Sequence, residues 1–163
     1  MHGKSTALLS ALMLAFAGSL THAQDKGHTT HVATDAHAMQ APWGIAGKKD
    51  LAQRTIRISM LDSMRFAPEK IEVKRGETVR FLLSNEGTLL HEFVLGTKAT
   101  LDEHAQMMAQ RPNMPHEAEY MTHVDPGKTE EVVWTFNRAG RFYYACLIAG
   151  HYQAGMIGTV LVK

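Results

Sequence analysis

Cysteine is almost missing from this chain, which has one in 163 residues. A single cysteine excludes an intrachain disulfide framework, a four-cysteine zinc site and a cysteine-ligated iron–sulfur cluster. An excess of one charge is missing too, since 17 basic residues face 16 acidic ones. A net charge so close to zero gives no support for binding nucleic acid through a basic surface. The length suits one domain and excludes a large multidomain enzyme.

Histidine and methionine, in contrast, are abundant, with ten residues of each type. Their side chains supply imidazole nitrogen and thioether sulfur, which are ligands that soft and borderline metal ions prefer. The composition therefore makes metal chemistry the first class of function to consider.

Long apolar runs are absent except at the N-terminus, where residues 1–23 have the pattern of a secretory signal peptide. Lys4 precedes an apolar stretch that ends at Thr21-His22-Ala23, with small residues at the two positions that a signal peptidase reads. The stretch is too short to span a bilayer comfortably, so a membrane anchor is the weaker interpretation. We therefore expect cleavage after about Ala23 and a periplasmic protein with no membrane association. A lone thiol in that oxidising compartment needs protection, which a metal would give.

Residues 24–50 contain almost nothing to bury, and we interpret them as a flexible tail ahead of the domain. Two roles stay open for this tail. It is either a solvated spacer or a weak copper-binding segment, since several imidazoles on a flexible chain can gather around one ion. The histidines concerned are His28, His31 and His37.

Residues 51–163 have the pattern of an all-β domain. Apolar and polar residues alternate with a period of two, first at Ile56, Ile58 and Met60, and Gly, Pro and Asn interrupt the pattern regularly. Short strands spaced in this way predict a β-sandwich or barrel rather than an α/β fold. The strands are expected near residues 56–61, 71–73, 79–83, 91–95, 131–136, 141–147 and 156–162.

One helix is expected to interrupt these strands. Thr100 and Glu103 have the spacing of a capping box, and acidic residues fall in the first turn that this box would start. The pattern predicts a helix from about Leu101 to Gln110, which Arg111-Pro112 would end.

The strongest chemical signal lies near the C-terminus, between the last two predicted strands. Cys146, His151 and Met156 follow one another with four residues between each pair, enough for one loop to curl around one ion. With His91 as a second imidazole they form the His₂Cys set with a weak axial Met that is typical of type 1 copper. Such a set serves both Cu(I) and Cu(II), because the thioether stabilises Cu(I) without demanding square geometry.

Each of these residues also has an ordinary interpretation when taken alone. A lone Cys146 is more often a buried small hydrophobe, His151 fits an ordinary loop, and Met156 fits a core position at the start of a strand. The four residues together, with a secretion signal and no disulfide partner, favour copper.

About the last two-thirds of the chain resembles the cupredoxins, the blue-copper family that includes plastocyanin, azurin and rusticyanin. Residues 64–81 are similar to the family's opening strands, and residues 142–146 to its approach to the ligand loop. Asn85 followed by His91 is similar to its first ligand segment. The resemblance implies a Greek-key β-sandwich that holds one copper at its loop end. Glu92 is a departure from the family, and a carboxylate so close to the copper would change the electrostatics.

The segment between His91 and the next predicted strand is rich in metal-binding side chains. Either its methionines simply fill gaps against the sandwich, or it is an auxiliary copper site in which thioethers select Cu(I). It is similar to additions found in periplasmic copper-resistance cupredoxins. The candidate auxiliary ligands are Met114, His116, Met121 and His123, besides the three tail histidines.

The sequence has no arrangement typical of a catalytic nucleophile, so we expect a binding protein and not an enzyme, with weak cuprous oxidation as the one activity left open. Two functions suit a copper ion that cycles between Cu(I) and Cu(II): copper tolerance in the periplasm, and one-electron transfer between redox proteins. A carrier needs an apolar or charged patch near His151, and the balanced charge gives no sign of one. Copper tolerance is therefore favoured, and its expected partners are copper ions. If the protein is instead an electron carrier, its expected partner is a redox protein.

Overall fold

The computed structural model describes residues 40–111 and 116–163 of the chain. Within these ranges the all-β class with one helical insertion is confirmed. The predicted signal peptide, the tail histidines and Met114 lie outside the described residues. The elements are β1 (Ile45–Ala46), the 3-10 helix η1 (Lys49–Leu51), β2 (Arg54–Leu61), β3 (Arg65–Ala67), β4 (Lys70–Val73), β5 (Glu77–Asn85), β6 (His91–Gly96), α1 (Lys98–Gln110), β7 (Met121–Val124), β8 (Thr129–Phe136), β9 (Gly140–Ala145) and β10 (Ile157–Val162).

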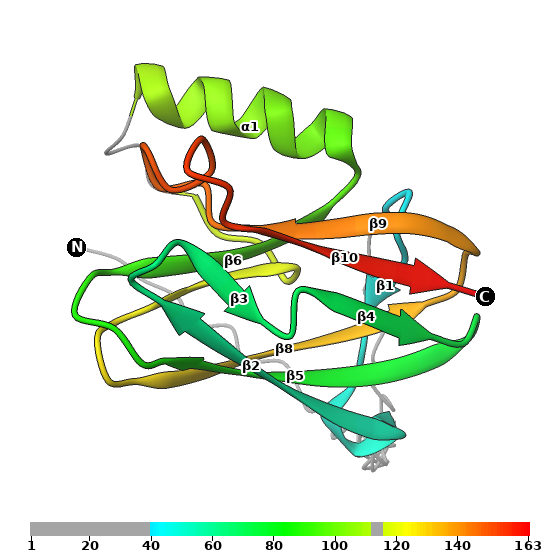
Figure 1. Cartoon of the computed structure of the whole chain (residues 1–163). Coiled ribbons are helices and arrows are strands. Elements are labelled where there is room, and N and C mark those ends of the chain that lie inside the picture. The colour runs from blue at the N-terminus through cyan, green and yellow to red at the C-terminus, as the bar shows by residue number, and fades with distance from the viewer. Residues whose placement is uncertain (1–39, 112–115) are drawn as a thin grey trace, which may run out of the picture. The chain divides into compact units, whose positions relative to one another are not determined.

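Two five-stranded sheets form the predicted sandwich, as Figure 1 shows. One sheet has the strand order β1-β8-β5-β2-β3, and the other has the order β4-β10-β9-β6-β7. The pairs β2–β5 and β4–β10 are parallel, and the other pairs are antiparallel. The chain passes between the sheets several times, so the connections that leave β5 and β9 bring residues distant in the sequence to one end of the sandwich.

The apolar residues with a period of two fill the space between the sheets. On β5, Val79, Phe81 and Leu83 are fully buried, while the residues between them are only partly buried. The ring of Phe93 lies 5.4 Å from that of Phe81 and is stacked at 5.4 Å on that of Tyr144. Burial of each of these large side chains stabilises the fold by about 1.5–3 kcal/mol, so this core holds the site-bearing strands in place.

β6 is buried on both of its faces. Phe93 and Leu95 pack between the sheets, whereas Val94 belongs to a second apolar cluster with Leu101 and Ala105 of α1. The helix covers the outer face of this sheet, where it packs on β6 and β9 (Figure 1). All six residues of β6 are buried as a result. Because successive side chains of a strand point to opposite faces, β6 sends its residues alternately into two different environments.

The helix begins at Lys98, three residues before the predicted start, and its end at Gln110 is as predicted. The capping box consists of Thr97 and Thr100: the Thr97 hydroxyl accepts from the Thr100 N–H (3.2 Å), and the Thr97 N–H donates to the Thr100 hydroxyl (3.0 Å). Thr100 therefore closes the box instead of opening it. The prediction was wrong because both threonines can cap, and the backbone selects the one that follows directly on β6.

Residues 40–50 pack against the sandwich, so the prediction of a flexible tail is wrong for these residues. Trp43 is only 6% exposed, and its carbonyl accepts a hydrogen bond from the Trp134 indole (3.0 Å). β1 then pairs with β8 through Ile45 and Ala46. One tryptophan buries enough apolar area to hold an otherwise polar segment against the sheet, an effect that the overall composition of the segment conceals.

Two short strands were also missed. β3 lies where Phe66-Ala67-Pro68 predicted a break, and it pairs with β2. β7 lies inside the predicted insertion and pairs with β6. Among the described residues, no helix has the length and apolar character needed to cross a membrane.

Candidate metal centre

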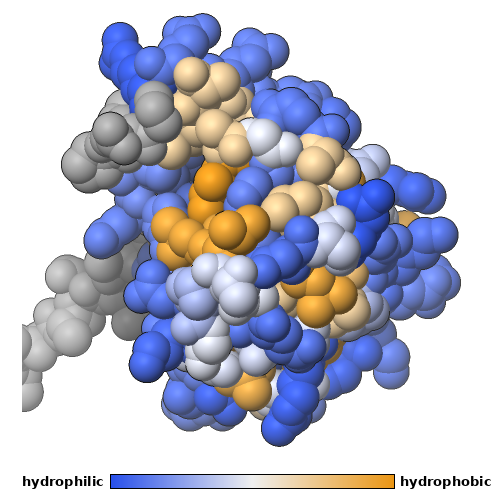
Figure 2. Space-filling model, turned by 60° about the vertical axis from the view of Figure 1, so that its left-hand side comes forward, coloured by the Kyte–Doolittle hydropathy of each residue, from blue (hydrophilic) through white to orange (hydrophobic). Residues whose placement is uncertain are grey.

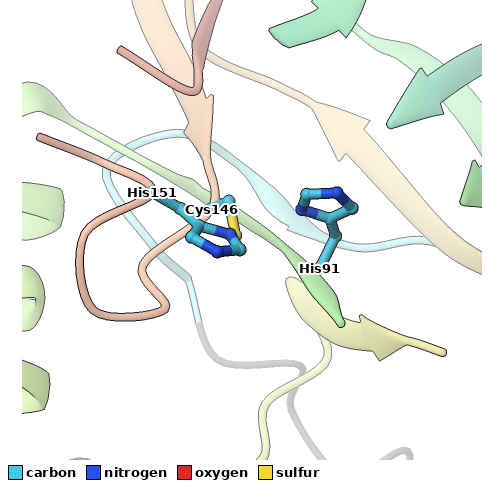
Figure 3. A group of neighbouring side chains, drawn as sticks. All are labelled: His91, Cys146 and His151. Carbon is cyan, nitrogen blue, oxygen red and sulfur yellow. The ribbon is translucent and has the colours of Figure 1, made fainter. Parts of the chain in front are cut away.

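Three predicted ligands meet at one end of the sandwich. His91 begins β6, Cys146 follows β9, and His151 lies in the loop that leads to β10. Their ligand atoms all lie within 4.8 Å of one another, and Cys146 Sγ is 3.3 Å from His151 Nδ1. Figure 3 shows the two imidazole rings and the sulfur converging from these separate segments. The structure therefore brings these three residues together, and their role as metal ligands stays a prediction.

The loop between β9 and β10 closes on itself and so brings two of these residues together. The Cys146 N–H donates to the Met156 carbonyl, and the Met156 N–H donates to the His151 carbonyl, both at 3.1 Å. Gly150 and Gly155 have φ of +91° and +94°, a left-handed conformation that favours glycine. These turns and hydrogen bonds fold the loop tightly.

Asp62 orients the ring of His91. Its Oδ1 lies 3.3 Å from His91 Nε2, which leaves Nδ1 as the nitrogen for a metal. The hydrogen bonds from the Thr88 N–H and hydroxyl to Oδ2, both 2.8 Å, lower the pKa of Asp62 to about 2, so its carboxylate is charged at neutral pH. A carboxylate that accepts from a ligand histidine fixes its tautomer and raises its basicity.

His91 Nδ1 has no hydrogen-bond partner among the described residues, although the side chain is completely buried. An unsatisfied buried polar nitrogen costs about 1–3 kcal/mol. A metal ion between His91, Cys146 and His151 would satisfy this nitrogen, so the residues fit a metal on geometric grounds.

Asn85 holds the loop that precedes His91. Its side chain is buried, and its Nδ2 donates to the carbonyls of Leu89 and Val124, both at 2.8 Å. Its Oδ1 accepts from the Gly87 N–H (2.9 Å). One amide thus ties the end of β5, the loop before β6 and the end of β7 together.

The thiol of Cys146 lies in the core and accepts a hydrogen bond from the Glu92 N–H (3.3 Å). Burial raises the pKa of this thiol to about 12, so the metal-free side chain carries its proton at neutral pH. A metal that binds here must displace that proton, which couples metal binding to proton release.

Met156 and His151 differ in exposure. Met156 is fully buried in the same apolar cluster as Cys146, a position that suits both a core residue and an axial ligand. His151 is partly exposed, and burial, followed by the nearby His91, lowers its pKa. At neutral pH its imidazole is therefore mainly neutral, as a metal ligand must be.

Comparison with known proteins identifies the family. The model of the copper binding proteins of the plastocyanin/azurin family matches residues 53–163. The chain belongs to this family. The predicted cupredoxin resemblance is confirmed, and copper is the metal that the His₂Cys centre fits. Copper supplies one-electron chemistry when bound in such a centre.

Relatives in this family match much of the chain. It is 46% identical to the copper-resistant cuproprotein CopI of Rubrivivax gelatinosus, over 98% of this chain and 99% of that protein. It is 40% identical to the protein of the same name from Pseudomonas aeruginosa, over 69% of this chain and 77% of that protein. The structure of auracyanin B has a TM-score of 0.60 at 23% identity, covering 77% of this chain and 99% of that one. That similarity shows the cupredoxin fold.

The structure also places the candidate auxiliary ligands. His116 and His123 come together with Glu92 on the outer side of β6, and one ligand atom from each residue lies within 4.8 Å of the others. Met121 is buried in the apolar cluster under α1. Glu92 was noticed in the sequence only as a departure from the family, and its grouping with the two histidines was missed. The available signal was its place next to His91, which puts its side chain on the opposite face of the strand.

Proposed function

We propose that this protein is an exported type 1 copper protein that serves copper tolerance in the periplasm. The observation that carries this proposal is the 46% identity with a copper-resistant cuproprotein over almost the full length of both chains. In this proposal His91, Cys146 and His151 bind copper, with Met156 as a weak axial ligand, and the protein is not an enzyme.

The shape of the centre supports a copper that cycles between Cu(I) and Cu(II). A thiolate, two imidazoles and a thioether suit both oxidation states. The closed loop from Cys146 to Met156 and the hydrogen bond that Asp62 accepts from His91 Nε2 hold the ligands in place. In this proposal the chain binds copper with little rearrangement in either oxidation state. A protein that takes up excess copper needs this property, because both Cu(I) and Cu(II) can be present.

The test is a gene deletion in the source organism, complemented with the wild-type gene or with Cys146→Ser. We expect the deletion and the Cys146→Ser strain to stop growing at a copper concentration that the wild-type strain tolerates. Respiratory electron flow at low copper should be the same in all strains. Normal growth of the deletion strain in high copper would contradict copper tolerance.

The proposed location has its own test. Fractionation should place the protein in the periplasm, and the N-terminus of the purified protein should follow Ala23. A cytoplasmic protein that still begins at Met1 would contradict export.

A soluble electron carrier is the second candidate, and the surface beside the copper centre favours it. Leu89 and Leu90, directly before His91, are 45% and 41% exposed. Figure 2 shows hydrophobic patches between hydrophilic ones on the face turned to the viewer. Exposed apolar residues near a redox centre suit a brief docking complex with a partner protein. Loss of respiratory electron flow in the deletion strain, with unchanged copper tolerance, would establish this role instead.

A further inference from the structure

Glu92 and two histidines form a polar cluster on the outer side of β6. Glu92 Oε1 lies 3.1 Å from His116 Nε2 and 3.3 Å from His123 Nε2, and Oε2 accepts from the Leu147 N–H (3.2 Å). The register of β6 with β7 creates this arrangement, because Glu92 and His123 are direct cross-strand partners. Cross-strand partners project from the same face of a sheet.

We propose that Glu92, His116 and His123 form a second metal site that binds one divalent transition-metal ion, with a preference for Cu(II). Metal bonds of about 2.0–2.2 Å separate the ligand atoms around one ion by about 3–4 Å. The present separations, all within 4.8 Å, need only small side-chain movements to reach that geometry. This second site can exist whether or not the protein serves copper tolerance and whether or not the His₂Cys centre binds copper.

The ligand types decide which ion the site prefers. Two imidazoles and a carboxylate offer nitrogen and oxygen, and no sulfur is among the three ligand atoms. Such ligands suit Cu(II) and Zn(II), and Cu(II) binds tighter than Zn(II) to the same donor set. The sequence had suggested thioether ligands and Cu(I) for this segment, and the structure brings together a harder set.

The burial of Glu92 supports the presence of a cation. Its side chain is 1% exposed. The side chains of the other acidic residues in the described ion pairs are all more exposed than this. A buried carboxylate without a compensating charge costs several kcal/mol. Among the described residues its ion-pair partners are His116 and His123, which are charged only when protonated. A divalent ion supplies that charge while both imidazoles stay neutral.

A third imidazole lies beside the cluster. The ring of His104, on α1, is 4.9 Å from the ring of His116. His104 Nε2 is buried and has no hydrogen-bond partner among the described residues. This unpaired buried nitrogen lies beside one residue of the cluster, and a rotation of the His104 side chain could bring it closer as a fourth ligand.

Ions can reach the cluster from solvent. A surface hollow borders His116 and His123, and three acidic residues line it. His123 is 43% exposed on this side. The acidic rim raises the local concentration of cations. These residues are Glu117, Glu119 and Glu130.

The experiment counts copper on the full mature protein, with the His₂Cys centre loaded and the three tail histidines replaced by alanine. Cu(II) is added against a competing chelator at neutral pH, and the bound copper is measured by elemental analysis and electron paramagnetic resonance. We expect a second equivalent with the wide hyperfine splitting of nitrogen and oxygen ligation. His116→Ala with His123→Ala should abolish that equivalent and leave the absorption of the first centre unchanged.

Two single variants guard against a folding defect. His123→Gln changes an exposed residue, and we expect it to weaken the second equivalent at least about tenfold. Glu130→Gln is the matched control, because it removes one of the three charges of the rim but no ligand, and it should weaken the second equivalent far less than His123→Gln does.

Three outcomes would overturn the proposal. The parent stops at one copper, the second copper persists in the His116/His123 double variant, or His123→Gln binds it as tightly as the parent does. Displacement of the second Cu(II) by an equal concentration of Zn(II) would overturn the preference for Cu(II).

Discussion

Neighbouring residues on the two faces of β6 belong to two different groups of side chains, each of which could hold a metal ion. His91 points to the inner side, where a thiol and a second imidazole lie in a closed, mainly apolar setting. Glu92 points to the outer side, where two imidazoles approach a carboxylate near an acidic hollow. His91 is fully buried, but His123 is 43% exposed. The alternation of a single strand is enough to separate a soft centre from a harder one.

The two environments also differ in how firmly they are built. The inner ligands are positioned by loops closed with backbone hydrogen bonds and by Asp62. The outer ligands are positioned by one strand register and by the carboxylate that they share. A rigid scaffold reduces the entropy lost on binding, so we expect the inner centre to bind copper much more tightly than the outer one.

The largest expected effect comes from Cys146→Ser. Serine has no thiolate, so the intense visible absorption of Cu(II) should disappear completely, while circular dichroism shows a folded sandwich. The nitrogen and oxygen signal of the outer site should persist in the same sample, which separates the two faces directly. Retained visible absorption would show that Cys146 is not a ligand.

Gly87→Ala should weaken the inner site alone. A Cβ at position 87 would clash with Asp62 Oδ1, so the carboxylate must leave its place beside His91. Loss of such a partner lowers metal affinity by about 10–100-fold, which a chelator competition measures. If the effect acts through Asp62, Gly87→Ala should add nothing in an Asp62→Ala background. An additive loss would show that the glycine acts by another route.

Replacements of Met156 should tune the inner site without emptying it. Met156→Leu keeps the volume and should cost less than about 1.5 kcal/mol in stability. It should raise the reduction potential, because loss of a weak donor harms Cu(II) more than Cu(I). Met156→Gln should lower the potential, since an amide oxygen is a harder ligand. Voltammetry that shows the wild-type potential in both variants would make Met156 a core residue only.

Tyr152→Phe should have the smallest effect. It removes a contact between the loop that follows β9 and the helix α1, and it changes no residue of either ligand set. The Tyr152 hydroxyl donates to Asp102 of α1 (2.7 Å), and Lys98 also donates to that carboxylate (2.6 Å). Loss of one such hydrogen bond should lower the free energy of unfolding by about 0.5–1.5 kcal/mol. Both copper signals should stay unchanged, and a shift in either one would mean that α1 helps to position the ligands.

The closeness of Cys146 and His151 could be predicted from sequence because its information is local. Cys146, His151 and Met156 lie in one loop, and the period of two placed His91 on a strand. Trp43 was missed because its burial depends on Trp134, which is distant in the sequence. The outer cluster was missed for the same reason, since the pairing of Glu92 with His123 depends on a strand register that no spacing reveals.

The side chain of Asn85 has a consequence for the timing of metal uptake. Its three hydrogen bonds hold the loop before His91 as soon as the chain has folded. The same fold places His91 beside Cys146 and His151. In the proposed copper protein, a loop held in this way would move little when the ion binds, so the arrival of copper and not a rearrangement of the chain would set the rate of uptake.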